Sequence, residues 1–163
     1  MKVAVFIGSA SDLDVARGAV DIFKQFAVPF SLEVTSAHRS PERTLGLIRS
    51  CEEQGCRMFI AMAGKAAHLA GVVAAHTLLP VIGVPIGGSS LAGMDALFST
   101  VQMPQGIPVA CMGIGKSGAA NAALLAVQIL SLEDEDLRAR FTAFRAAMPE
   151  HVKQSSQGVK EQL

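Results

Sequence analysis

Five short apolar runs recur along the chain, and segments with helical spacing separate them. The runs cover residues 2–7, 29–35, 57–62, 80–84 and 107–114. Three stretches, 3–7, 58–62 and 81–84, are apolar at nearly every position and lack the period-two alternation of a strand that faces water on one side. This pattern is typical of strands that helices cover on both faces. It predicts five βα units, a five-stranded parallel sheet and a three-layer α/β/α sandwich with right-handed crossovers.

The segments between the runs predict helices at 12–26, 41–54, 66–76, 90–102 and 118–130. A sixth helix, over about 133–153, should begin in the acid-rich stretch 131–136. Because five strands already complete the sheet, we expect the apolar stripe of this extra C-terminal helix to pack on a neighbouring subunit. We expect residues 1–163 to form a single α/β domain whose polar tail, 154–163, is frayed.

Composition narrows the range of partners. The chain has 14 basic and 14 acidic residues, so no net charge attracts nucleic acid or an anionic membrane. Tyr and Trp are absent, which removes the usual platforms for stacking bases. Charged residues make up 17% of the chain, against roughly 25% in an average globular domain. A small chain this poor in charge often hides surface in subunit interfaces, so we expect a homo-oligomer.

The three cysteines, Cys51, Cys56 and Cys111, lie in helical or apolar runs. An odd number in such runs is typical of reduced, buried thiols in a cytoplasmic protein. The spacing of Cys51 and Cys56 is not that of a zinc site, and we expect no metal. No apolar run reaches ~18 residues without Gly or Pro, so neither secretion nor membrane insertion is expected.

The tetrapeptide Ser36–Arg39 lies between an expected strand and an expected helix. Ser40 suits the N-cap of that helix and Pro41 its first position. His38 can move a proton near neutral pH, and the guanidinium of Arg39 can bind a phosphate with two donors. The alternative is a loop histidine satisfied by a carbonyl beside an exposed arginine. We favour a functional site, because ligands bind at this edge of open α/β sheets and the glycine-serine turn after the first strand belongs to the neighbouring unit.

The stretch 8–12 closes the first strand and opens the first helix. Gly8 lets the backbone approach a ligand, Ser9 and Ser11 offer hydroxyl donors, and the helix N-terminus favours an anion. Asp12 can accept hydrogen bonds from a sugar. Neither a Walker loop nor GxGxxG is present, so ATP and dinucleotides are poor candidates. Ser11 could instead be a plain helix cap paired with Asp14, and spacing does not decide between these readings.

A third candidate loop, 63–71, follows the third strand. Gly64 permits an unusual backbone angle, and the small Ala66 leaves room for a ligand at the helix start. Lys65 is either a ligand contact or a solvated loop charge. His68, on a short apolar helix, is more often a satisfied core or interface histidine than a ligand-binding residue.

Five ordered segments of the chain resemble the N5-carboxyaminoimidazole ribonucleotide mutase family of purine biosynthesis, over roughly residues 3–144. They are Gly8-Ser9-Ala10-Ser11-Asp12, Ser36-Ala37-His38-Arg39, Ala66-Ala67-His68-Leu69, Val101-Gln102-Met103-Pro104 and the stretch 119–126. The resemblance implies a flavodoxin-like fold, a cytoplasmic octamer whose sites are shared between subunits, and no cofactor. It implies conversion of the N5-carbamate of aminoimidazole ribonucleotide into the C4-carboxylate.

The resemblance also assigns roles to residues. His38 would be the acid/base group, Ser9, Ser11 and Arg39 would hold phosphate, and Asp12 would hold the ribose. The remaining substrate-binding residues would be Ser36, Gly64, Lys65, His68 and Leu69. A functional partner would be an ATP-dependent synthetase that forms the carbamate, although the sequence does not show whether that enzyme delivers it.

Two positions depart from the pattern of this family. Lys65 replaces the usual Gly of the mutase branch, and Ala70 replaces its usual Pro. The related branch, which carboxylates aminoimidazole ribonucleotide directly with carbon dioxide, tends to carry a basic residue at the first position. Because Ala66-Ala67-His68-Leu69 follows the mutase pattern, we favour the mutase and keep the carboxylase as its competitor. A non-catalytic flavin-binding or receiver module would need a stacking aromatic or an acidic cluster that the first loop lacks.

Overall fold

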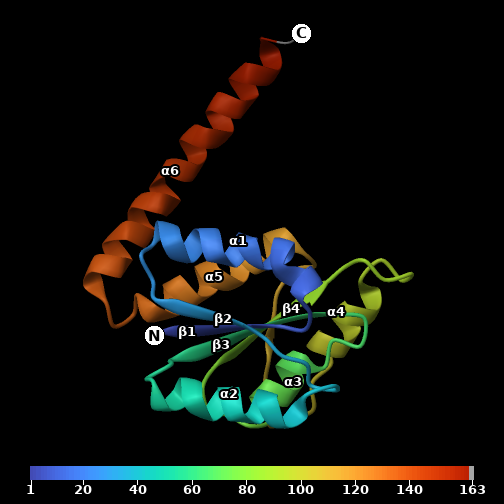
Figure 1. Ribbon diagram of the computed structural model, residues 1–163. Helices are drawn as coiled ribbons and strands as arrows, with labels where there is room; N and C mark the ends of the chain where they lie inside the picture. The colour runs from blue at the N-terminus through green and yellow to red at the C-terminus, as the bar shows by residue number, and fades with distance from the viewer. Residues whose placement is uncertain (162–163) are drawn as a thin grey trace. The chain divides into compact units, whose positions relative to one another are not determined.

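Five parallel strands form one sheet in the computed structural model, which describes residues 1–161 (Figure 1). The strand order is β2-β1-β3-β4-β5. The strands are β1 (Val3–Ile7), β2 (Phe30–Val34), β3 (Met58–Gly64), β4 (Val81–Ile86) and β5 (Ala110–Cys111). The helices are η1 (Ala10–Asp12), α1 (Leu13–Gln25), α2 (Pro41–Glu53), α3 (Leu69–Ala74), α4 (Met94–Val101), α5 (Lys116–Leu130) and α6 (Glu135–Lys160).

Burial of the central strands explains their unbroken apolar runs. Every residue of β1 and β4 is buried, as are the first five residues of β3. Helices α1 and α5 lie on one side of the sheet, and α2 and α3 lie on the other (Figure 1). The predicted five-stranded parallel sheet and flavodoxin-like three-layer sandwich are therefore confirmed.

Alternate side chains of each central strand pack against the helices on opposite faces of the sheet. Ala4 and Phe6 of β1 join Phe59 of β3 and Ile48 of α2 in one cluster of buried side chains. The Phe6 and Phe59 rings lie 5.5 Å apart in a tilted arrangement, which suits aromatic pairs. This packing fixes the register of β1 against β3, since a one-residue slip would turn every side chain to the wrong face.

The fifth strand is shorter than the sequence predicts. The apolar run 107–114 forms a two-residue strand, because β5 lies at the sheet edge and Pro108 has no amide hydrogen to donate. Pairing extends by one bond, in which the Met112 amide donates to the Gly83 carbonyl.

Several helices also differ in length from the predicted ones. Helix α3 begins at Leu69 rather than at residue 66, and α4 covers only Met94–Val101 of the predicted 90–102. Backbone turns that precede each helix, including Gly93 at φ +88°, explain both late starts.

Contacts along the chain define two compact units, Met1–Ala126 and the part that begins at Val127. Most of the second unit is α6, whose N-cap Asp134 accepts the Leu137 amide hydrogen at 2.9 Å. This helix continues to Lys160, beyond the predicted end at about 153, so residues 154–160 are helical. The polar residues there contain no helix breaker except Gly158, and the Ser155 hydroxyl bonds the His151 carbonyl. Within residues 1–161, the helices are too short or too polar to cross a bilayer.

Gly83 in β4 provides a test of how tightly the sheet packs. A Cβ at this position would lie 2.4 Å from Cγ2 of the buried Thr100 and 3.0 Å from Val109. We expect Gly83→Ala to lower the free energy of unfolding by about 2 kcal/mol or more, because a packed core cannot absorb the methyl group. The matched control is Gly46→Ala on α2, since nothing lies within 4 Å of its added Cβ. Gly46→Ala should raise the free energy of unfolding by about 0.5–1 kcal/mol. Equal urea midpoints for the two variants would contradict this account.

Candidate functional site

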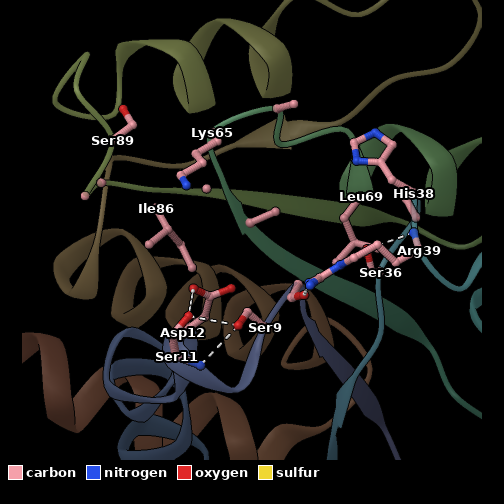
Figure 2. A pocket seen from close by; sticks show the side chains of 17 residues that line it. Ser9, Ser11, Asp12, Ser36, His38, Arg39, Lys65, Leu69, Ile86 and Ser89 are labelled. Carbon is pink, nitrogen blue, oxygen red and sulfur yellow. Dashed lines mark hydrogen bonds between the residues drawn. The ribbon is translucent and has the colours of Figure 1, made fainter.

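A cavity of about 650 Å³ opens where the parallel strands end. Its walls come from the loops after β1, β2, β3 and β4 (Figure 2). The chain leaves β1 toward β2 on one side and later returns to place β3 on the other, so the cavity lies at the topological switch point of the sheet. Open α/β sheets bind ligands there, and the volume is in the range of small-molecule sites.

The loop after β1 presents two hydroxyl groups to the cavity. Ser9 is the N-cap of η1, and its Oγ accepts hydrogen bonds from the Ser11 amide at 3.3 Å and the Ser11 hydroxyl at 2.9 Å. Ser9 thus caps η1 and Asp12 occupies the N-cap position of α1, so the alternative cap formed by Ser11 and Asp14 is wrong. Both hydroxyls, together with the start of α1, suit an anionic group.

Asp12 is the one carboxylate among the residues that line this cavity. Partial burial raises the pKa of Asp12, because desolvation outweighs the hydrogen bonds from the Ser9 backbone and the Ser11 hydroxyl. The hydroxyls of a sugar would restore part of the lost solvation of this group.

Arg39 connects the first two loops. Its Nη2 donates to the Gly8 carbonyl at 3.2 Å, and its Nε donates to Ser36 Oγ at 3.4 Å. The same Ser36 oxygen accepts the Arg39 amide at 3.2 Å. These bonds hold the guanidinium beside the Ser9–Ser11 turn, so cation and hydroxyl donors serve one anion site (Figure 2).

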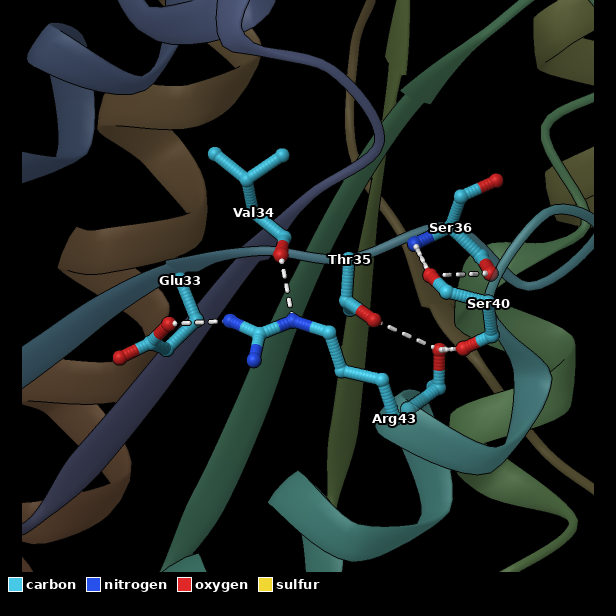
Figure 3. Close-up of polar contacts among 7 residues, drawn as sticks. Glu33, Val34, Thr35, Ser36, Ser40 and Arg43 are labelled. Carbon is cyan, nitrogen blue, oxygen red and sulfur yellow. Dashed lines mark hydrogen bonds and ion pairs between the residues drawn. The ribbon is translucent and has the colours of Figure 1, made fainter.

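Side-chain hydrogen bonds stabilise the junction between β2 and α2 (Figure 3). Ser40 is the N-cap of α2 as predicted, but its side chain bonds Ser36 instead of capping the helix. The buried Thr35 and Thr44 hydroxyls lie 2.7 Å apart. Arg43 points away from the cavity and pairs with Glu33 at 2.9 Å. Of the two arginines in this segment, only Arg39 lines the cavity.

His38 and His68 contact each other across two loops. His38 Nε2 lies 2.9 Å from His68 Nδ1, and the rings meet edge to face at 5.0 Å. One of the two nitrogens must carry the hydrogen, so each ring restricts the tautomer of the other. His38 lines the cavity, whereas His68, the N-cap residue of α3, is exposed and is not among the lining residues. His68 therefore contacts the cavity through His38.

The loop after β3 supplies Gly64, Lys65, Ala66 and Leu69 to the cavity. An added Cβ on Gly64 would approach the Ile86 carbonyl to 3.2 Å, which explains the glycine. Lys65 has a φ of +56°, a left-handed angle that is uncommon for residues with a side chain. The loop is attached to α4, since the Ala67 amide donates to Ser99 Oγ at 3.0 Å and this hydroxyl donates to the Lys65 carbonyl.

Sequence reasoning missed a fourth wall of the cavity. Ile86, Gly87, Gly88 and Ser89, after β4, also line it. The sequence signal there, a Gly-Gly-Ser stretch directly after a buried strand, predicts a turn but indicates no ligand chemistry. Of the site residues that the sequence predicts, all except His68 line the cavity directly. Within residues 1–161, no cluster of three His, Cys, Asp or Glu side chains could hold a metal ion.

These features define a flavodoxin-like α/β protein with a polar pocket suited to a phosphorylated small molecule. A family model described as AIR carboxylase matches residues 2–151. The N5-carboxyaminoimidazole ribonucleotide mutase of Escherichia coli K12 is 49% identical over 93% of this chain and 89% of its own length. The mutase of Bacillus subtilis is 47% identical over 94% and 95%. A crystal structure of Treponema denticola PurE gives a TM-score of 0.86 at 26% identity, covering 97% of this chain and 98% of that one. The chain belongs to the AIR carboxylase family.

Asp12 generates a prediction about pH and stability. A folded-state pKa above the unfolded value means that stability falls as pH rises from the ordinary aspartate range through the folded pKa, and that the full loss persists above it. At pH 7, Asp12→Asn should match or exceed the wild-type melting temperature by up to about 3 °C. Near pH 3 this advantage should vanish.

The control is Asp14→Asn, an exposed carboxylate in the first turn of α1 whose loss should give no gain. Thermal unfolding of both variants at the two pH values checks this account. A lower melting temperature for Asp12→Asn at pH 7 would show that the carboxylate stabilises the folded chain.

Proposed function

We propose that the chain is an N5-carboxyaminoimidazole ribonucleotide mutase of purine biosynthesis, which moves the carboxylate of its substrate from N5 to C4. One observation carries the proposal. In a chain of the AIR carboxylase family, the cavity at the sheet switch point joins the imidazole of His38 to an anion site made by Arg39 and the Ser9–Ser11 turn.

In this proposal the anion site binds the substrate phosphate, and Asp12 accepts hydrogen bonds from the ribose. Ser36, Gly64, Lys65 and Leu69 then surround the imidazole ring. Fixing the phosphate at one end aligns the heterocycle with His38, so that the reacting groups meet without a separate search. The proposal involves no cofactor.

The reaction exchanges one bond for another. The N5–carboxylate bond breaks as the protonated His38 donates a proton to N5, and the released carbon dioxide stays in the pocket. C4 of the ring then bonds to the carbon dioxide carbon, and the C4 proton leaves to His38. The proton lost from C4 balances the one gained at N5, so the histidine ends in its starting state.

His68 supports this chemistry through its contact with His38. If His68 Nδ1 carries the hydrogen, His38 Nε2 is the acceptor in the free chain, and this is the same nitrogen that exchanges a proton with the substrate. The substrate would then displace His68 from this hydrogen bond. His68 is a positioning residue in the proposal.

The direct carboxylase is the second candidate, because Lys65 and Ala70 depart from the mutase pattern.

The test offers purified enzyme either the carbamate or aminoimidazole ribonucleotide with bicarbonate, and His38→Asn is the control. We expect the wild type to use the carbamate efficiently. We expect His38→Asn to lose at least about 100-fold in turnover while it still binds the product nucleotide, since general acid–base groups contribute about 10²–10⁴-fold.

The outcomes separate the alternatives. Efficient use of bicarbonate with little use of the carbamate would assign the chain to direct carboxylation. Substantial turnover by His38→Asn would remove that histidine from the proton transfer under either reaction. Calorimetric binding of the product to the variant shows that the pocket remains intact.

We further propose that residues 1–163 form one α/β domain that assembles as an octamer through α6 and the outer helices. Large apolar side chains on the first unit are exposed in the single chain, among them Leu78, Leu91 and Phe98. On α6, Met148, Val152 and Val159 are exposed at helical spacing. Light scattering should give about eight times the 17.0 kDa chain mass, and a monomer at micromolar concentration would contradict the proposal.

The family resemblance alone supports two further proposals, on the cellular compartment and on the source of the substrate. The enzyme acts in the cytoplasm, and its substrate comes from an ATP-dependent synthetase that makes the carbamate. Cell fractionation tests the first proposal. For the second, the two enzymes are assayed together with a reagent that captures free carbamate, and turnover that persists would show that the synthetase delivers the carbamate directly.

A further inference from the structure

The charged groups of the cavity are few and are separated in space. Among the residues that line it, the titratable side chains are Asp12, His38, Arg39 and Lys65. The Arg39 guanidinium lies with Ser9 and Ser11 on one side, and the Lys65 side chain extends over Ile86 on the other (Figure 2). The pocket therefore holds two separate cationic groups, which suits a ligand with two anionic groups.

The two cations differ in their partners. Arg39 is already bonded to Gly8 and Ser36, but the Lys65 ammonium has no ion pair or hydrogen bond with any of residues 1–161. Its backbone, in contrast, is held in place. The Lys65 carbonyl accepts the Ala67 amide at 2.9 Å and the Ser99 hydroxyl at 3.4 Å. A fixed backbone with an unpartnered ammonium over a cavity leaves the charge available for a ligand.

The backbone angle adds a second observation. A glycine would adopt the φ of +56° at position 65 without strain, yet the chain has a lysine there. A positive φ alone marks no site, because Ala27 and Ala92 share it and lie outside the cavity. Lys65 is the one of these three that combines the strained angle with a charged side chain in the cavity, which is where such strain is often functional.

We propose that Lys65 binds the carboxylate of the substrate and of the product, and so distinguishes carboxylated from uncarboxylated imidazole ribonucleotides. The inference rests on the proposed function and names the part of the substrate that the lysine contacts. The phosphate occupies the Arg39 site, and the carboxylate lies at the other end of the heterocycle. Neutral carbon dioxide, formed midway, carries no charge for the ammonium to hold.

This assignment has a kinetic consequence. Lys65 binds the carboxylate before and after the transfer but gains nothing when the carboxylate has become neutral carbon dioxide. It therefore stabilises the bound substrate without stabilising the decarboxylated state through which the reaction passes, and this lowers KM and kcat together. Lys65→Met keeps an unbranched side chain of similar size and removes the ammonium group. We expect KM for the carbamate to rise about tenfold or more, in line with the loss of one hydrogen bond to a charged group, and kcat to rise with it, so that kcat/KM changes by less than about threefold.

Binding measurements give the sharper test. Calorimetry should compare the 4-carboxylated nucleotide with aminoimidazole ribonucleotide, which has the phosphate but no carboxylate. Lys65→Met should weaken binding of the first by about tenfold or more and change the second by less than about twofold. Arg39→Ala should weaken both alike, because both carry the phosphate. Lys24→Met, which removes an exposed lysine from the last turn of α1, should change neither.

Each other outcome has a defined meaning. Equal weakening of both nucleotides by Lys65→Met would show that the lysine does not distinguish the carboxylate, and no weakening of either would show a solvated loop charge. Both results overturn the inference. If the wild type bound neither nucleotide, the proposed function itself would fail. Melting temperatures close to that of the wild type confirm that the variants fold.

Discussion

Parallel pairing of β1 with both β2 and β3 is the constraint on which the site depends. In a sheet built this way all strands end at one edge, so the chain must deliver each following loop to that edge. Loops more than fifty residues apart in sequence thus meet around one cavity. No single loop contains a complete site. The first has hydroxyls without a cation, the second has a cation and an imidazole, and the third has the group that orients the imidazole.

Arg39 and His38 are neighbours in sequence but bond in different directions, and this divergence organises the pocket. Arg39 reaches the Gly8 carbonyl of the β1 loop, whereas His38 reaches His68 of the β3 loop. The β2 loop therefore cross-links the other two. Ser40 holds this loop closed, because its hydroxyl forms two hydrogen bonds with the backbone of Ser36 instead of capping the helix. A flexible loop would leave the two functional groups free to turn, and the anion site would lose its alignment with the imidazole.

The sequence predicted the fold and most of the site because both depend on short-range patterns. Unbroken apolar runs identified the buried strands, and their position before small, polar turns identified the edge where ligands bind. The wall after β4 was missed because Gly87 and Gly88 carry no side chain whose chemistry could be read. The contact of His38 with His68 could not be predicted either, since it joins residues 30 apart that follow β2 and β3, two strands that both pair with β1. Late starts of α3 and α4 depend on backbone turns that tertiary contacts such as Ala67 to Ser99 stabilise.

The exposure of the catalytic groups connects the proposed chemistry to the proposed assembly. His38, Arg39 and Lys65 are all exposed in the single chain, and the cavity is open to solvent on that side. A reaction that releases carbon dioxide and recaptures it at C4 needs a closed pocket, because an open one would lose the intermediate to water. A neighbouring subunit that covers this edge would exclude water, strengthen the interaction of Lys65 with a carboxylate, and keep the intermediate within reach of the ring. The same surface would then account for both the low charge of the chain and the retention of carbon dioxide in the proposed reaction.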